Sequence, residues 1–173
     1  MERKVFTHLV GLRAKALNNA LTLAGFRRSQ TISYRPACEG CNACISVRVR
    51  SNEFTPSRTQ LRIISKNRDL SAISQDKRAS PEQFNLFKRY IRGRHKDSGM
   101  ADMSFNDYQM MIEDSYVETQ IIEYRLGSLH DPNGTLVACC LTDYLSDGLS
   151  MVYSFYDPTM RKKSLGVFMI LDH

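Results

Sequence analysis

The sequence predicts an α+β fold, and three observations carry that prediction. Apolar residues recur with helical spacing before residue 115 and with a period of two from 117 to 156, and a strand then passes directly into a helix. The 173 residues leave room for one domain, or for one with a small appendage. Apolar residues make up 42% and charged residues 24%, which excludes a disordered chain and a collagen-like repeat.

Four helices are expected ahead of the alternating region. Residues 12–24 place their apolar side chains on one face, and Gly25 follows as a suitable helix end. The Thr-Pro pair at 55–56 is a typical helix start, and residues 80–83 have the spacing of a capping box. A further short helix is expected over residues 104–114.

Alternating residues predict the strands. Residues 27–34 and 46–50 each alternate in character, so each is expected to form a strand in the amino-terminal part. Three later segments are expected to form an antiparallel meander, because only short turns separate them. These strands cover 117–126, 136–145 and 149–156, with turns at 131–134 and 146–148.

Hydrophobic runs in this chain are short. No stretch approaches the roughly 18 consecutive apolar residues that a membrane-spanning helix needs. The first residues lack the basic-then-apolar order of a secretory signal. We therefore expect a cytoplasmic protein with no membrane partner.

Positive charge is concentrated in one segment. The formal net charge is +6, yet residues 27–68 alone hold nine basic and two acidic residues, and the remainder has a net charge of −1. Arg58, Arg62 and Lys66 recur every four residues, which places them along one side of the expected helix. This pattern suits a polyanion such as nucleic acid, and a solvated basic face remains the alternative.

Five cysteines, an odd number, do not indicate a disulfide framework. Cys38, Cys41 and Cys44 form a C-x2-C-x2-C cluster, which has the spacing of zinc or iron–sulfur ligands. A closed site needs a fourth ligand, and Cys139 and Cys140 are adjacent in a predicted strand, so at most one of them can join. Free reduced thiols are the alternative.

The predicted strand-to-helix connection near the end of the chain has the features of an anion site. Its basic residues at 161–163 precede Ser164 and Gly166, which open an apolar helix. The amino terminus of a helix offers unpaired N–H groups to a phosphate or carboxylate. An ordinary capped helix on a basic surface is the alternative. The sequence contains no nucleophile elbow, Walker loop or dinucleotide fingerprint.

Several distinctive motifs follow one another along the chain. They are Gly25-Phe26-Arg27-Arg28-Ser29, Tyr34-Arg35-Pro36-Ala37-Cys38, Cys41-Asn42-Ala43-Cys44, the run at 54–62, Thr142-Asp143, Asp147-Gly148-Leu149-Ser150, Tyr153, Phe155-Tyr156-Asp157-Pro158 and Ser164-Leu165-Gly166. In this order they resemble one family, the aminoacyl-tRNA–protein transferases, and in detail its bacterial leucyltransferase branch.

The resemblance implies a basic, cysteine-containing amino-terminal domain over 1–72 and a GNAT-like acyltransferase domain over 73–173. It implies transfer of leucine from leucyl-tRNA to proteins with an amino-terminal Asp or Glu, which marks them for degradation in the N-end rule pathway. Family members carry a cysteine-bearing segment before this start and further strands after His173. We therefore expect this chain to be truncated at both ends.

The proposed chemistry assigns roles to particular residues. The ester of an aminoacyl-tRNA is already activated, so no cofactor is required, but the acceptor amine, with a pKa of about 7.7–8.0, must lose a proton. Asp143, Tyr153, Tyr156 and Asp157 are the catalytic candidates, although at least one tyrosine is expected to be packed and Asp157 is also placed to form a turn. The tRNA phosphates are assigned to Arg27, Arg28, Arg58, Arg62, Lys66, Ser164 and Gly166.

Three other functions fit parts of the sequence. An arginyltransferase would differ only in the aminoacyl-tRNA that it uses. A non-enzymatic nucleic-acid-binding module would explain the basic segment and the cysteines, but not the strand-to-helix unit. An N-acetyltransferase would use acetyl-CoA in place of tRNA.

Overall fold

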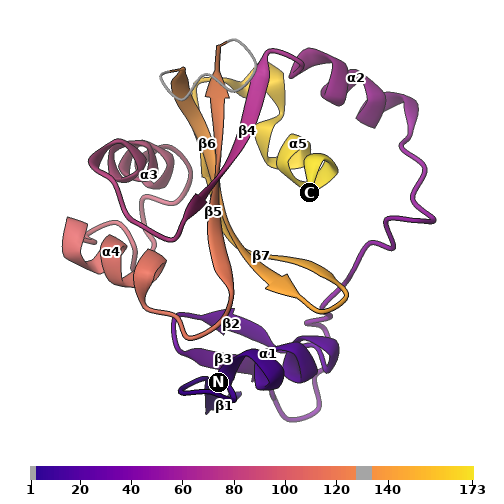
Figure 1. The fold of residues 1–173 in the computed structure, drawn as a ribbon, viewed down its shortest axis with the longest axis vertical. Coiled ribbons are helices and arrows are strands. Elements are labelled where there is room, and N and C mark those ends of the chain that lie inside the picture. The colour runs from indigo at the N-terminus through magenta and orange to yellow at the C-terminus, as the bar shows by residue number, and fades with distance from the viewer. Residues whose placement is uncertain (1–2, 128–133) are drawn as a thin grey trace.

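A computed structural model of the chain describes residues 3–127 and 134–173. A four-stranded antiparallel sheet forms its centre, with helices on both faces, and a small three-stranded sheet with one helix packs below it (Figure 1). The α+β prediction is confirmed. None of the described helices is long and apolar enough to cross a membrane.

The amino-terminal unit contains β1 (Lys4–His8), α1 (Ala14–Leu23), β2 (Arg27–Ser29) and β3 (Ile32–Pro36). Its strands pair antiparallel in the order β1-β3-β2. The helix expected over 12–24 is confirmed apart from its end residues. The single strand predicted over 27–34 is wrong, because Gln30 adopts a positive φ of 51° and turns the chain into the β2–β3 hairpin.

The central sheet has the order β4-β5-β6-β7. Its strands are β4 (Leu70–Asp76), β5 (Thr119–Leu126), β6 (Thr135–Leu145) and β7 (Gly148–Tyr156), and the last three form the expected meander. β4 lacks a clean alternation of apolar residues, so its sequence does not indicate a strand. The predicted domain boundary between 72 and 73 falls inside β4, all of whose residues pair with β5. The turn predicted at 131–134 lies, in its first three residues, outside the described residues.

The other helices are α2 (Arg58–Lys66), α3 (Pro81–Arg94), α4 (Phe105–Glu113), the short 3-10 helix η1 (Arg161–Lys163) and α5 (Leu165–Asp172). Capping boxes begin α2, α3 and α4. In each, the side chain of the capping serine accepts from the backbone N–H three residues later, and the side chain of that later residue accepts from the backbone N–H of the serine. The cap of α2 is Ser57, two residues after the predicted one.

The strand predicted over 46–50 is wrong. These residues belong to no ladder, and Val47 is 89% exposed. The segment is held instead by single contacts: Ser46 Oγ donates to the carbonyl of Gly25 at 2.8 Å, and Arg48 pairs with Asp147 at 2.8 Å. Alternation suits a strand only where a neighbouring strand offers its backbone, and none lies beside this segment in the described chain.

Two apolar cores cover the two faces of the central sheet. The α3–α4 face buries Leu86, Phe87, Tyr108, Cys139 and Phe155, and the α5 face buries Tyr124, Cys140, Leu165, Phe168 and Met169. As predicted, the adjacent cysteines lie on opposite faces. Burial raises the pKa of the Cys140 thiol to about 11 and that of Cys139 well above its usual value, so both are packed as neutral thiols.

Candidate nucleic-acid interface

The connection between β7 and α5, residues 156–166, is called the crossover below. Asp157 shapes its first turn: Oδ1 accepts from the backbone N–H of Thr159 at 2.9 Å and from its hydroxyl at 2.6 Å. The backbone N–H of Asp157 donates to the carbonyl of Val137 at 2.8 Å, which ties the turn to β6. Asp157 Oδ2 lies 3.6 Å from an Arg89 guanidinium nitrogen. One carboxylate oxygen therefore holds the turn, and the other faces an arginine.

Tyr156 lies against the beginning of α5. A Cβ atom at Gly166 would come within 3.2 Å of the Tyr156 ring, so glycine allows this close approach. Ser164 is exposed and has a positive φ of 52°, and its side chain caps no helix N–H. Three of the predicted site residues are thus brought together around the first turn of α5, where the N–H of Val167 donates to the carbonyl of Ser164 at 3.0 Å and the N–H groups of Leu165 and Gly166 precede the first bond of the helix.

The carboxyl end of α2 is fastened to η1, although about a hundred residues separate them. The buried Asn67 donates from Nδ2 to the carbonyls of Ile63 and Lys163, both at 2.8 Å. Lys163 Nζ in turn lies 2.6 Å from Asp69 Oδ2 and 3.2 Å from the carbonyl of Lys66. This junction brings the basic stripe of α2 beside the basic residues of η1 within the crossover.

The resulting basic region is called the α2–η1 surface. It consists of the exposed side chains of Arg58, Arg62, Lys66, Arg161 and Lys162. Within the described part of the chain, no carboxylate pairs with any of these five cations. Lys163 does not belong to this surface, because its ammonium group forms an ion pair with Asp69.

Arg28 lies elsewhere and is buried. Its Nε and one terminal nitrogen each lie 2.6 Å from an Asp143 carboxylate oxygen, and the two side chains are only 3% and 2% exposed. Thr119 donates to the same carboxylate at 2.7 Å, and the remaining Arg28 nitrogen donates to the carbonyl of Gln30 at 2.9 Å. All three guanidinium nitrogens are therefore used inside the protein, which leaves Arg28 no face for phosphate and Asp143 no access to substrate.

Arg27, the neighbour of Arg28, is exposed on β2. The amino-terminal unit packs beside the start of β7, whereas the crossover follows the end of that strand (Figure 1). The structure thus does not bring Arg27 beside the α2–η1 surface.

The two candidate tyrosines face opposite cores, as the alternation predicted. Tyr153 packs on the α3–α4 side, 6.2 Å from the ring of Phe87, and burial raises its pKa to about 12. It is therefore protonated near neutral pH and is suited to donate a hydrogen bond rather than to accept a proton. Tyr156 packs against the α5 core and makes an edge contact with Tyr90, with ring centroids 5.0 Å apart.

In the described part of the chain, the cysteine cluster belongs to no group of side chains that could hold a metal ion. Cys38 contacts the backbone of Arg3 through its sulfur, while Cys41 and Cys44 are exposed. Among the described residues, no three His, Cys, Asp or Glu side chains gather closely enough to hold a metal ion. The three thiols as placed do not fit the predicted zinc or iron–sulfur site.

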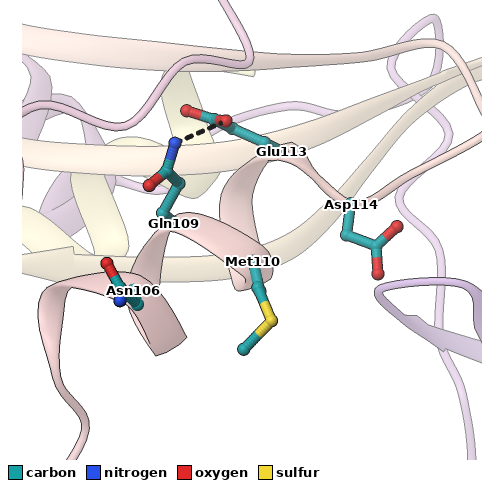
Figure 2. A pocket seen from close by; sticks show the side chains of 5 residues that line it. All are labelled: Asn106, Gln109, Met110, Glu113 and Asp114. Carbon is teal, nitrogen blue, oxygen red and sulfur yellow. Dashed lines mark hydrogen bonds between the residues drawn. The ribbon is translucent and has the colours of Figure 1, made fainter.

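A shallow hollow of about 370 Å³ lies beside α4, where Figure 2 shows its lining side chains. It contains none of the predicted site residues. Glu113 in its wall accepts from Gln109 at 3.0 Å and from the backbone N–H of Ala79 at 2.9 Å, so its carboxylate serves the local structure. Glu113 is therefore a structural group in this hollow and not a free carboxylate.

The basic end of α3 is absent from the sequence-based site prediction. Residues 88–96 hold five Lys and Arg and no acidic residue. The net charge of all residues outside 27–68 is close to zero, because acidic residues elsewhere offset the positive charge of this run. A sliding window of about ten residues would reveal it.

Two family models cover most of the chain. The model described as "Arginine-tRNA-protein transferase, N terminus" matches residues 1–62, and "Arginine-tRNA-protein transferase, C terminus" matches residues 82–173.

Curated relatives are similar over almost the whole chain. The protein of Sinorhizobium medicae (strain WSM419) is 56% identical, with 100% of this chain and 69% of the relative covered. The protein of Methylobacterium sp. (strain 4-46) is 58% identical, with 99% of this chain and 71% of the relative covered. Both are named aspartate/glutamate leucyltransferase. As the sequence motifs indicated, the chain belongs to the arginine-tRNA–protein transferase family.

Proposed function

We propose that the protein transfers leucine from leucyl-tRNA to the amino-terminal Asp or Glu of acceptor proteins, marking them for degradation. One observation carries this proposal: relatives that are 56–58% identical over at least 99% of the chain share the name aspartate/glutamate leucyltransferase. Because aminoacyl-tRNA is made in the cytoplasm, we propose that the protein acts there. The donor ester is already activated, so the reaction requires no cofactor.

The crossover is the proposed reaction site. The α2–η1 surface supplies cations for the tRNA backbone, and each neutralised phosphate releases condensed counterions. The first turn of α5, with Ser164 and Gly166, suits the last phosphate before the ester. Tyr156 packs beside that turn and Asp157 is the next residue along the chain, and both remain the candidates for orienting the acceptor amine and receiving its proton. The exposed Arg27 on β2 is the proposed contact for a more distant tRNA phosphate.

A transfer assay tests this proposal directly. The purified protein is incubated with tRNA charged with labelled leucine and with peptides that begin with Asp, Glu or Ala. Leucine on the first two peptides, and not on the third, is the expected result. The proposal fails if the protein transfers no leucine to any peptide.

An arginyltransferase is the second candidate, since the descriptions of both matching family models name an arginine-tRNA-protein transferase. The same assay with labelled arginine separates the two. Arginine transfer without leucine transfer would favour this candidate. Binding of tRNA without transfer of either amino acid would favour a non-enzymatic nucleic-acid-binding module.

A further inference from the structure

The carboxyl end of α3 has a concentrated positive charge. Arg92, Arg94 and Lys96, here called the α3-end cluster, are exposed around a hollow of about 440 Å³ lined by residues 92–98. Asp97 is the only acidic residue in that lining. No carboxylate in the described chain pairs with any of the three cations. Their charges are therefore free for an anion from outside.

The helix alone does not account for this cluster. Cations in the last turn of a helix interact favourably with its dipole, and Arg92 and Arg94 are placed for that. Lys96, however, lies beyond the C-cap residue His95, so it is not part of the last helical turn. Lys88 and Arg89 belong to the same run but are engaged: Lys88 Nζ donates to the carbonyl of Ala101 at 2.6 Å, and an Arg89 nitrogen lies 3.6 Å from Asp157 Oδ2. The three remaining cations repel one another, and a bound polyanion would relieve that repulsion.

The α3-end cluster adjoins the crossover. A Cβ atom at Gly93 would lie 2.9 Å from Pro158 Cγ, so the helix end packs directly on the crossover. One turn earlier, Tyr90 contacts Tyr156 by its ring, and its hydroxyl lies 3.2 Å from His95 Nε2. The cluster is thus fixed beside the proposed reaction site by backbone and ring contacts.

The α2–η1 surface reaches the same crossover from the other side. α3 packs on one face of the central sheet, whereas α5 and the contacting residue Ile63 of α2 pack on the other (Figure 1). Two basic regions that are remote in sequence therefore meet at the crossover: Arg161 and Lys162 of the α2–η1 surface lie within it, and the end of α3 packs on its Pro158. A nucleic-acid strand that contacts both regions would pass over Tyr156 and Asp157.

We propose that the α3-end cluster is a second phosphate-binding surface for the acceptor arm of tRNA, on the opposite side of the crossover from the α2–η1 surface. This inference rests on the proposed function, because it assumes that tRNA brings its ester to the crossover. Phosphates held on both sides fix the direction of the strand between them, whereas one basic surface alone leaves it free to pivot.

The test measures binding of an RNA hairpin with a tRNA acceptor-stem sequence and a single-stranded 3′ end. The variant Arg92→Gln/Arg94→Gln/Lys96→Gln is compared with Arg3→Gln/Arg13→Gln/Arg78→Gln, which removes the same charge from exposed positions elsewhere. Affinity is measured at several salt concentrations. The first variant is expected to lower the slope of log affinity against log salt by about 0.7–0.9 for each phosphate that it no longer neutralises, and the second to leave it unchanged.

Two further variants keep the test decisive. Arg92→Lys/Arg94→Lys preserves the charge and is expected to retain the slope. If the triple variant does not fold, Lys96→Gln alone, beyond the helix end, is expected to lower the slope by about 0.7–0.9. If the cluster and control variants have equal salt slopes while the parent protein transfers leucine, the second phosphate-binding surface is contradicted and the proposed function is not. A parent protein that neither binds the hairpin nor transfers leucine overturns the proposed function itself.

Discussion

Arg28 and Arg62 belong to the same basic segment of the sequence, yet the fold uses them in opposite ways. Arg28 is buried with every guanidinium nitrogen bonded inside the protein, and Arg62 is exposed on α2. The partner of Arg28 is Asp143, 115 residues away. Net charge in a segment therefore overestimates the cations available to a ligand, because some of that charge is neutralised in the core.

The buried pair also joins the two parts of the molecule. Arg28 comes from β2 of the amino-terminal unit, and Asp143 comes from β6 of the central sheet. Asn18 of α1 adds a weaker contact to the same carboxylate at 3.4 Å. The basic segment thus divides into a structural group at the junction of the two units and a group that is open to ligand.

The largest expected effect comes from breaking the buried pair. Asp143→Ala should lower the free energy of unfolding by about 3–5 kcal/mol, because it leaves the Arg28 guanidinium buried without its counterion. Denaturant unfolding measures this decrease. The double variant Arg28→Met/Asp143→Ala should be destabilised by less than the sum of the two single variants, since no unpaired charge remains. A decrease below about 1 kcal/mol in Asp143→Ala would contradict the structural role.

An intermediate effect, on binding rather than stability, is expected from α2. Arg58→Ala, Arg62→Ala and Lys66→Ala should each change the free energy of unfolding by less than about 0.5 kcal/mol, since the side chains are exposed. Each should lower the salt slope of tRNA binding by about 0.7–0.9. Lys15→Ala, on α1, serves as a control that keeps the slope. Unchanged slopes in all three variants would make the stripe an ordinary solvated face.

Local patterns in the sequence predict local structure well. The capping boxes at Ser80 and Ser104 set helix starts, because a cap depends on residues only three apart. The alternation of apolar and polar residues identifies β5, β6 and β7, because it too depends only on residues that are close in the sequence. Non-local pairing is what such patterns miss: β4 forms a strand because β5 offers it an edge, and residues 46–50 stay outside any sheet despite better alternation.

The candidate site shows the same division. Short patterns suffice to predict the basic stripe on α2 and the crossover individually. Their contact depends on the buried Asn67, which bonds to Lys163 across 96 residues, and no local pattern indicates that bond. The burial of Arg28 escapes prediction in the same way, since its carboxylate partner lies on a strand of the other unit.

The smallest expected effect concerns a second ion pair across the same junction. Arg48 and Asp147 meet at 2.8 Å, but their side chains are 53% and 43% exposed. Water screens both charges in the folded as well as in the unfolded protein. Arg48→Ala should therefore lower the free energy of unfolding by only about 0.2–1 kcal/mol, and this difference from the parent protein should vanish in concentrated salt. Denaturant unfolding at low and high salt measures both. A decrease as large as that of Asp143→Ala would mean that burial does not set the strength of ion pairs at this junction.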